Sequence, residues 1–132
     1  MRIGTHGPVR LLMATPVVAV DPTASLRAAA VVLGAEDIGA VVVQGTGGLD
    51  GVLSERDIVR ALAAGADPDE APVAGAVAGD PLCVDVETPV AEVIGLMLET
   101  GIRHVPVVAG REAVGMVSIR DVLDVVVSEL PG

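Results

Sequence analysis

Apolar positions in this chain follow two patterns that alternate along its length. Runs of consecutive valines, typical of buried strands, are separated by longer stretches in which apolar residues recur every three or four positions, typical of helices. Glycine, proline and aspartate mark the boundaries between these segments, and these residues favour turns. The patterning therefore predicts a mixed fold of short strands and short helices.

The same order of elements is predicted twice. In the first half the elements are a short helix over 9–14, a short strand over 17–20, a helix over 25–33 stopped by Gly34, a strand over 39–44, a glycine-rich hairpin turn over 45–50, a strand over 51–53 and a helix from Ser54 to about Ala64. In the second half they are a short helix over 73–78, a short strand over 82–84, a helix over 88–100, a strand over 103–108, a turn over 109–112, a strand over 113–117 and a helix over 118–129. Each half is thus a β-α-β-β-α unit, with one small sheet backed by helices.

The two halves are related by a gapless repeat at an offset of 64 residues. The heptapeptide GVLSERD at 51–57 returns as GMVSIRD at 115–121, with Gly, Ser, Arg and Asp in the same places. The offset also relates Val20, Asp21, Ile38, Val41 and Val43 to Val84, Asp85, Ile102, Val105 and Val107. A unit of about sixty residues is not expected to bury its apolar face alone, so the two repeats should form one pseudo-symmetric domain with paired, equivalent clefts.

The repeat and the turn-forming residues set the domain boundaries. A flexible N-terminal segment over 1–8 precedes a first repeat over 9–64, a polar linker with two prolines over 65–72, and a second repeat over 73–130. The linker acids Asp67, Asp69 and Glu70 are expected to be solvated and not to form a metal site.

Composition argues against several classes of function. Of the 132 residues 52% are apolar, but Phe, Tyr and Trp are absent, so a ligand base would lie between aliphatic walls without aromatic stacking. The formal charge of −10 argues against nucleic acid and anionic membranes as partners, because both are bound through basic surfaces. All eight basic residues are arginine, so a phosphate loop of the Walker type and a Schiff-base nucleophile both lack their lysine.

The few cysteine and histidine residues also limit the chemistry. The single cysteine, Cys83, cannot form an intrachain disulfide, and we expect it to be a small core residue on a short strand. With only His6 and His104 beside it, a zinc cluster is not expected. The sequence shows no signal-peptide pattern and no apolar run of about 18 residues, so a soluble, cytoplasmic protein is expected.

The repeated Ser-x-x-Asp pairs, Ser54 with Asp57 and Ser118 with Asp121, have two interpretations. Serine at a helix N-cap and an acid three residues later form a capping box, in which each side chain satisfies an exposed amide. Each pair also ends a strand that emerges from a glycine, and such a turn exposes amides and the positive end of the helix dipole to anionic ligands. A carboxylate there can accept hydrogen bonds from a ribose diol. The two roles are compatible, since the cap would hold the acid in position.

The duplicated G-h-h-S-x-x-D ending, preceded in each repeat by an I-x-x-V-x-V strand, resembles a tandem pair of CBS domains, known as a Bateman module. The resemblance covers about residues 9 to 129, nearly the whole chain. It implies an α+β fold in which two CBS repeats pack through small three-stranded sheets, and it implies assembly into a disc-shaped homodimer. It also implies clefts that bind an adenosine-containing ligand such as AMP, ADP, ATP or S-adenosylmethionine.

The resemblance assigns roles to the motif residues. It implies that Asp57 and Asp121 bind ribose hydroxyls, and that Ser54 and Ser118 bind ribose or phosphate. It further implies that the short strands offer backbone groups to the adenine edge, near Thr15-Pro16 and Asp80-Pro81.

Basic residues distinguish the two expected clefts. Arg56 and Arg120 lie inside the motifs and could reach phosphate or the facing repeat, although a solvated arginine at a helix start is an equal alternative. The family often places basic residues just before the main strand, where Arg103 and His104 stand in the second repeat. Glycine and alanine stand at the matching positions 39–40. The second cleft is therefore the better phosphate site, unless His104 is an ordinary strand histidine with a partner of its own.

Two functions remain open at this point. The chain is expected to be a stand-alone regulatory or sensor module that binds an adenosyl ligand, chiefly in the second cleft, and signals through dimer or protein-partner contacts. The alternative is a ligand-free structural or dimerisation module whose Ser-x-x-Asp motifs are helix caps only. An enzyme is not expected, because the chain has no G-x-S-x-G, no H-E-x-x-H, no lysine and no Cys-His pair close in sequence.

Overall fold

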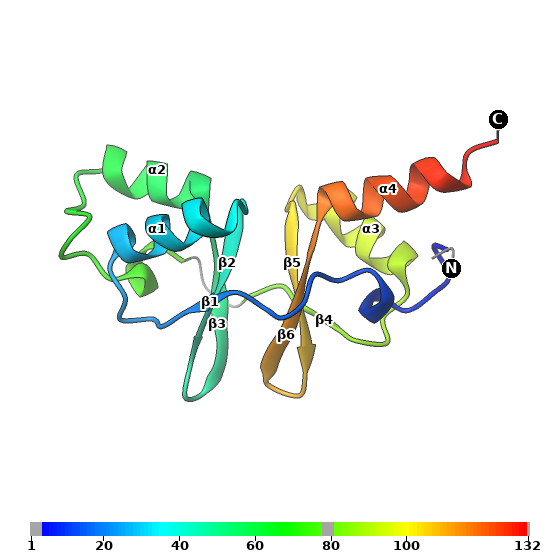
Figure 1. Ribbon diagram of the computed structural model, residues 1–132, viewed down its shortest axis with the longest axis horizontal. Helices are drawn as coiled ribbons and strands as arrows, with labels where there is room; N and C mark the ends of the chain where they lie inside the picture. The colour runs from blue at the N-terminus through cyan, green and yellow to red at the C-terminus, as the bar shows by residue number, and fades with distance from the viewer. Residues whose placement is uncertain (1–3, 78–80, 132) are drawn as a thin grey trace. The chain divides into compact units, whose positions relative to one another are not determined.

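The computed structural model describes residues 4–77 and 81–131 and divides the chain into two compact units (Figure 1). The central unit comprises Val18–Pro81, and the terminal unit comprises Met1–Val17 together with Leu82–Gly132. Both units combine helices with a three-stranded sheet, so the predicted α+β fold is confirmed. Residues 1–3 of the predicted N-terminal segment, Ala78 of a predicted helix, and Asp80 lie outside the described residues.

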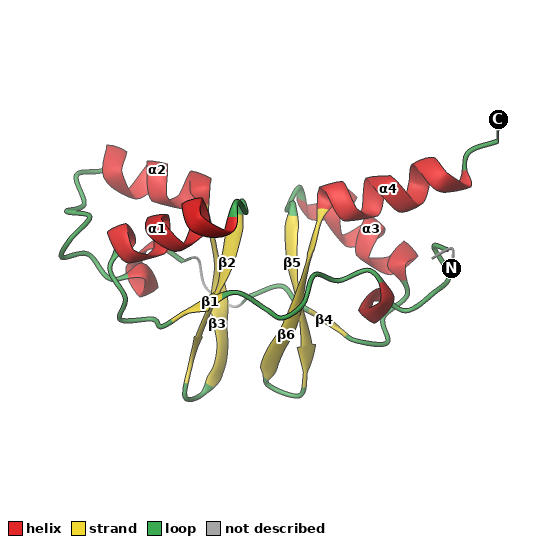
Figure 2. Cartoon of the chain, viewed as in Figure 1, coloured by secondary structure: helices red, strands yellow, loops and turns green. Residues whose placement is uncertain are grey.

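In the central unit, two α-helices back one sheet (Figure 2). Its elements are β1 (Ala19–Val20), α1 (Leu26–Glu36), β2 (Ala40–Gly45), β3 (Gly48–Ser54), α2 (Glu55–Ala63) and the 3-10 turn η2 (Val73–Ala76). The middle strand, β2, is parallel to β1 and antiparallel to β3. Alternate residues of β2 join the helices in a buried aliphatic core, which includes Val41, Val43, Leu26, Leu33, Ile58 and Val73.

The terminal unit has the same arrangement. Its elements are η1 (Val9–Leu11), β4 (Val84–Asp85), α3 (Val90–Thr100), β5 (His104–Ala109), β6 (Glu112–Ser118) and α4 (Ile119–Glu129). The middle strand, β5, is parallel to β4 and antiparallel to β6. Its core is equally aliphatic and includes Val9, Val93, Met97, Val105, Val107 and Val122.

Each unit contains the short 3-10 turn of the other sequence repeat. The turn η1, which opens the first repeat, packs in the terminal unit, where Val9 N–H donates to Thr88 C=O (2.8 Å). The turn η2, which opens the second repeat, packs in the central unit, where Val73 N–H donates to Ala24 C=O (2.8 Å). The compact units therefore differ from the sequence repeats, and each core is completed by a valine of the other repeat.

Helix α1 is longer than the sequence predicts. The expected stop at Gly34 is wrong, because α1 continues to Glu36 and is capped by Asp37, whose backbone is left-handed (φ 53°, ψ 49°). Glycine lowers helix stability by up to about 1 kcal/mol relative to alanine, but it does not end a helix whose other residues are packed. The core contacts of Leu33, directly before the glycine, hold this turn in place.

The two hairpins are tighter than predicted. Gly45 pairs with Gly48 and Ala109 with Glu112, so each loop contains only two residues. Most of the glycine-rich segment over 45–50 is therefore strand. Gly48 adopts φ 102°, a conformation that side chains with a Cβ avoid.

The second short strand begins later than its counterpart, and Pro106 explains the difference. In the central unit, Val42 N–H donates to Val18 C=O (3.0 Å). Pro106 occupies the position of Val42 and has no N–H to donate, so the pairing with β5 starts only at β4 (Val84–Asp85). Cys83 lies before that strand and is exposed, so its predicted place in the core is wrong.

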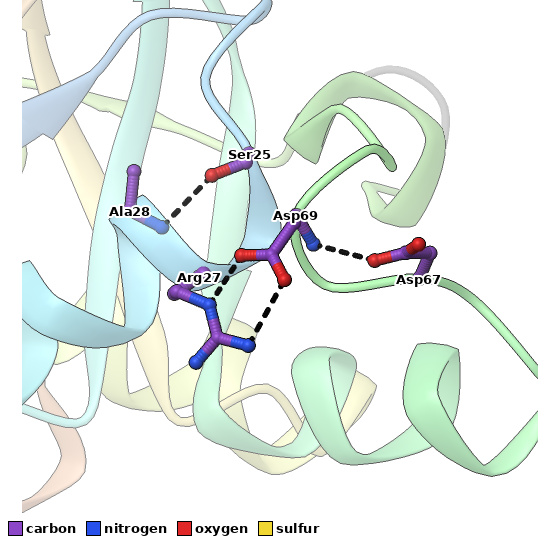
Figure 3. A network of polar contacts seen from close by, with 5 residues as sticks. All are labelled: Ser25, Arg27, Ala28, Asp67 and Asp69. Carbon is purple, nitrogen blue, oxygen red and sulfur yellow. Dashed lines mark hydrogen bonds and ion pairs between the residues drawn. The ribbon is translucent and has the colours of Figure 1, made fainter.

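The linker between the repeats is attached to the start of α1 (Figure 3). The Arg27 guanidinium makes a two-point ion pair with Asp69, and Asp69 N–H donates to Asp67 (2.9 Å). The hydrogen bond from Arg27 lowers the pKa of the Asp69 carboxyl, and the same contact raises the pKa of Arg27. Both side chains are exposed, so the pair orders the linker and adds little to stability.

Gly51 and Gly115 are positions where another segment lies directly on the sheet. A Cβ at Gly51 would collide with the side chain of Val77. A Cβ at Gly115 would lie 2.5 Å from Met13 Sδ and 3.1 Å from the carbonyl oxygen of Ala14. Glycine is therefore required at both positions for the segments to pack.

We expect Gly51→Ala to lower the free energy of unfolding by about 1–3 kcal/mol, as overpacked cores do. Gly115→Ala is expected to cost less, because the thioether of Met13 is flexible. Gly75→Ala is the matched control, since a Cβ there meets no atom within 4 Å. Urea unfolding followed by circular dichroism measures all three, and equal stability of the Gly51 and Gly75 variants would contradict the close packing.

Candidate functional site

Both Ser-x-x-Asp motifs form the same reciprocal cap at a strand-to-helix junction. Ser54 Oγ accepts a hydrogen bond from Asp57 N–H (3.2 Å), and Asp57 Oδ2 accepts from Ser54 N–H (2.8 Å). The corresponding distances between Ser118 and Asp121 are 3.2 and 2.8 Å. The capping-box interpretation is therefore confirmed in both repeats. Each pair is half-buried, between the last residue of a strand and the first turn of a helix.

The serine hydroxyls are also donors to the capped carboxylates. Ser54 Oγ–H donates to Asp57 Oδ2 and Ser118 Oγ–H donates to Asp121 Oδ2, both at 2.9 Å. Each hydroxyl thus uses its one hydrogen and one of its two lone pairs within the motif. The other carboxylate oxygen, Oδ1, accepts no hydrogen bond among those of the described residues. One serine lone pair and the whole of Oδ1 remain for a ligand.

The first helical amides are mostly satisfied as well. Glu55 N–H donates to Gly39 C=O (3.0 Å), and Ile119 N–H donates to Arg103 C=O (2.7 Å). These bonds attach the start of each helix to the segment that precedes the middle strand. The N–H at the second helical position, in Arg56 and Arg120, cannot bond within its helix. Within the described part of the chain no hydrogen bond from that N–H is recorded, so one amide at each helix start remains for a ligand.

The surroundings of the two motifs differ, as the sequence predicts. Register places His104 directly opposite Ser118 across β5 and β6, at a distance where side chains on the same face are neighbours. The same register places Ala40 opposite Ser54. Arg103, which precedes His104, is exposed. The terminal unit therefore gathers an imidazole and a guanidinium near its Ser–Asp pair, and the central unit does not.

The arginines inside the motifs, Arg56 and Arg120, are exposed and form no ion pair within the described part of the chain. Among residues 4–77 and 81–131, ion pairs are formed only by Arg10 with Glu87 and by Arg27 with Asp69. Arg56 and Arg120 are neighbours of the motif aspartates in sequence, but successive residues lie about 100° apart around a helix. The structure thus joins Ser to Asp in each motif and leaves the arginine between them in solvent.

One candidate binding group is not apparent from the motifs. Val18 C=O accepts a hydrogen bond from Val42 N–H, but its counterpart Leu82 C=O has no hydrogen bond among those of the described residues. The cause is Pro106, which removes the donor. A proline within a predicted middle strand is the sequence signal for such an open acceptor.

The described residues contain neither a candidate metal-ligand cluster nor a candidate membrane-spanning helix. Residues 4–77 and 81–131 contain no group of three His, Cys, Asp or Glu side chains that could hold a metal ion. None of the helices in this part of the chain has the length and apolar character of a membrane span.

Comparison with known proteins agrees with the geometry. Hypoxic response protein 1 of Mycobacterium tuberculosis is 38% identical over 116 residues, which cover 86% of this chain and 80% of that protein. A crystal structure of Hypoxic Response Protein I with two coordinated zinc ions has a TM-score of 0.81 at 33% identity, and the match covers 94% of this chain and 99% of that one.

Two further solved structures contain bound ligands. The CBS domain protein PAE2072 from Pyrobaculum aerophilum, complexed with AMP, has a TM-score of 0.80 at 31% identity, with 91% of this chain and 98% of that one covered. The CBS domain pair of protein MJ0100, in complex with 5′-methylthioadenosine and S-adenosyl-L-methionine, has a TM-score of 0.85 at 23% identity, with 93% and 98% covered. At that identity the second likeness concerns the fold alone.

The family assignment rests on nearly the whole chain. Residues 9–64 and residues 74–128 each match the CBS domain. The match has the offset of the internal repeat, and it includes both capped Ser–Asp pairs. The chain therefore belongs to the CBS domain family and contains two copies of the domain in tandem.

Proposed function

We propose that this protein is a stand-alone regulatory module that binds an adenosine-containing ligand beside Ser118 and Asp121. The relative from Pyrobaculum aerophilum binds AMP, and the CBS pair of MJ0100 binds 5′-methylthioadenosine and S-adenosylmethionine. The candidates are AMP, ADP, ATP and S-adenosylmethionine, which share the adenosine group. The role is binding and not catalysis, in a cytoplasmic homodimer that signals through its own contacts or through a protein effector.

The observation that carries the proposal is the state of the Asp121 carboxylate. Its Oδ2 atom is fixed by Ser118 N–H and Oγ–H at 2.8 and 2.9 Å, while Oδ1 is open among the described residues. An ionised carboxylate oxygen can accept hydrogen bonds from both hydroxyls of a ribose diol. Because the cap already fixes the side chain, little conformational entropy is lost on binding.

The hydrogen-bond directions divide the ligand between the motif residues. Ser118 Oγ–H is used by Asp121, so the hydroxyl can accept from ribose but has no hydrogen for a phosphate oxygen. We therefore assign Ser118 to the ribose. The phosphate, where the ligand has one, falls to donors: the guanidinium groups of Arg103 and Arg120, the backbone N–H of Arg120, and His104.

Charge favours the terminal unit for an anionic ligand. The chain has a formal charge of −10, so a nucleotide is repelled at long range and must be held by local cations. Arg103 supplies such a cation beside the second motif, whereas Gly39, at the matching position of the first repeat, supplies none. The Ser54–Asp57 pair, with Arg56, is proposed as the weaker of the two sites.

Absorbance of the purified protein gives a direct test of the ligand class. Because the chain has no Phe, Tyr or Trp, a band near 260 nm belongs to a bound chromophore. We expect such a band to survive desalting and to be released by denaturation as an adenine compound. If the protein purifies without ligand, we expect thermal unfolding to shift when AMP, ATP or S-adenosylmethionine is added. A ligand at 100 times its Kd adds about 2.7 kcal/mol to stability.

Replacing the aspartates separately tests the site. Asp121→Ala removes the proposed ribose acceptor, and we expect the Kd of the adenosyl ligand to rise by about 10- to 100-fold, as for loss of a charge-assisted hydrogen bond. Asp57→Ala controls for the loss of the cap, because it removes an identical cap in the other unit, and we expect it to weaken binding only at the proposed weaker site. Both variants should lose about 1 kcal/mol of stability. Calorimetric titration that gives wild-type affinity for Asp121→Ala would rule out the ribose contact.

The ligand-free alternative has one observation in its favour. Each Ser–Asp pair already has a complete structural role as a capping box. A protein that shows no bound chromophore, and whose unfolding temperature does not change with any of the three ligands, would be a dimerisation module whose motifs are caps only.

A further inference from the structure

Residues 4–8, which precede the 3-10 turn η1, are bound to the start of α3 in the terminal unit (Figure 1). Val90 N–H donates to Gly7 C=O (2.9 Å), and Ala91 N–H donates to Thr5 C=O (2.8 Å). These are the first two amides of α3, and amides at such positions have no partner within their own helix. The segment over 4–8, here called the strap, therefore caps α3 with its backbone.

The strap is the counterpart of the linker between the repeats. In the central unit, Leu26 N–H donates to Ala71 C=O (3.1 Å) at the start of α1. Each of these residues lies 64 positions from its equivalent in the strap bond, where the donor is Val90 and the acceptor is Gly7. The internal repeat therefore extends through the strap, and the two helix starts are covered by equivalent segments of backbone.

The two helix starts differ in their further attachments. Ser25 caps α1 with its side chain, and the linker is also attached to this helix by the ion pair of Arg27 with Asp69. The N-cap of α3 is Pro89, which makes no side-chain cap bond. Ala91 stands at the position that corresponds to Arg27. Capping of the first amides of α3 therefore depends on the strap to a greater extent than capping of α1 depends on the linker.

Glu129, the last residue of α4, binds the strap. Its Oε1 atom accepts a hydrogen bond from Thr5 N–H (2.8 Å). A carboxylate is unfavourable at a helix C-terminus, because the last carbonyl groups form the negative end of the helix dipole. The corresponding residue of the first repeat is Gly65, so the repeated fold does not require an acid at this position. The contact with the strap gives Glu129 a role that its own helix does not.

Burial distinguishes the strap from the residue that follows it. None of residues 4–8 is buried, whereas Val9 is completely buried (0% exposed) in the core of the terminal unit. Segments with few buried apolar contacts and with hydrogen bonds near the surface open at a lower free energy than the core does. The strap can therefore detach from α3 while Val9 stays in the core.

We propose that the strap is a conformational switch of the terminal unit, which opens and closes before Val9 while the unit stays folded, and that Glu129 holds it closed. In the open state the first two amides of α3 are exposed to water, and the end of α4 is no longer bound to the strap. Helix α4 begins at the Ser118–Asp121 motif and ends at the contact with the strap. The switch goes beyond the proposed function and does not depend on a bound ligand.

Hydrogen exchange measured by NMR tests the switch at single amides. In the wild-type protein we expect the N–H groups of Val90 and Ala91 to be protected. In Glu129→Ala we expect both to exchange about tenfold faster, as for the loss of a charge-assisted hydrogen bond. The N–H of Met97, in the middle of α3, should keep its wild-type rate. Glu112→Ala is the matched control, because it removes the same charge from an exposed position on β6 and should change none of these rates.

A conservative variant and the rates at other amides separate the possible outcomes. Glu129→Gln keeps a side-chain oxygen that can accept from Thr5 N–H, and we expect it to restore much of the protection. Wild-type exchange rates in Glu129→Ala would overturn the role assigned to Glu129. Equal acceleration at Met97 would show unfolding of the whole unit and would overturn the switch. Unprotected amides at Val90 and Ala91 in the wild-type protein would overturn the closed strap. None of these measurements uses a nucleotide, so the proposed function is tested separately.

Discussion

The reciprocal hydrogen bonding between serine and aspartate at each strand-to-helix junction is the interaction on which both the fold and the proposed site depend. The Asp57 and Asp121 carboxylates satisfy the N-cap amides through one oxygen, and the other oxygen accepts no hydrogen bond from any residue that the structure describes. A capped helix start is stabilised by about 1 kcal/mol, and the same bonds remove the rotational freedom of the carboxylate. The aspartate that starts the helix is therefore also the one that is oriented for a ligand.

The two repeats share one backbone arrangement, but the side chains around their Ser–Asp pairs differ. The hydrogen bonds of the two caps have equal lengths, and the sheets share the same register and the same irregularity before the hairpin. The difference lies in the side chains: His104 is opposite Ser118, whereas Ala40 is opposite Ser54. Pro106 adds a backbone difference, since it leaves Leu82 C=O without the donor that Val42 provides to Val18. This combination of equal geometry and unequal side chains is the reason for proposing a stronger site in the terminal unit and a weaker one in the central unit.

The sequence predicts the caps and the sheets because their signals are local or periodic. A serine followed three residues later by an acid indicates a helix start within one turn. The 64-residue repeat shows the same pattern for each element at two places in the chain, so each prediction has two independent signals. Both predicted helix starts, at Ser54 and Ser118, agree with the structure. The order of strands within each sheet also follows from the pattern, because a hairpin joins adjacent antiparallel strands.

Features that depend on distant contacts were harder to predict. Gly34 was expected to end a helix, but the core contacts of Leu33 hold the turn that contains it. Cys83 was expected in the core, but it is exposed, as is its repeat counterpart Ala19. The packing of η1 in the terminal unit and of η2 in the central unit has no local signal at all. The glycines at 51 and 115 are an indirect signal of this packing, because they leave space on the sheet for the residues that follow each 3-10 turn.

Comparison of the two repeats distinguishes positions that core packing constrains from positions that it does not. Positions 33 and 97 are buried in both repeats and differ only between leucine and methionine, because each must fill a similar aliphatic core. Positions 60 and 124 are exposed, and there the repeats differ in the sign of the charge. No contact within either unit accounts for that difference, since neither side chain forms an ion pair among the described residues. Such exposed positions are not limited by core packing, so they can differ in charge while positions 33 and 97 stay aliphatic.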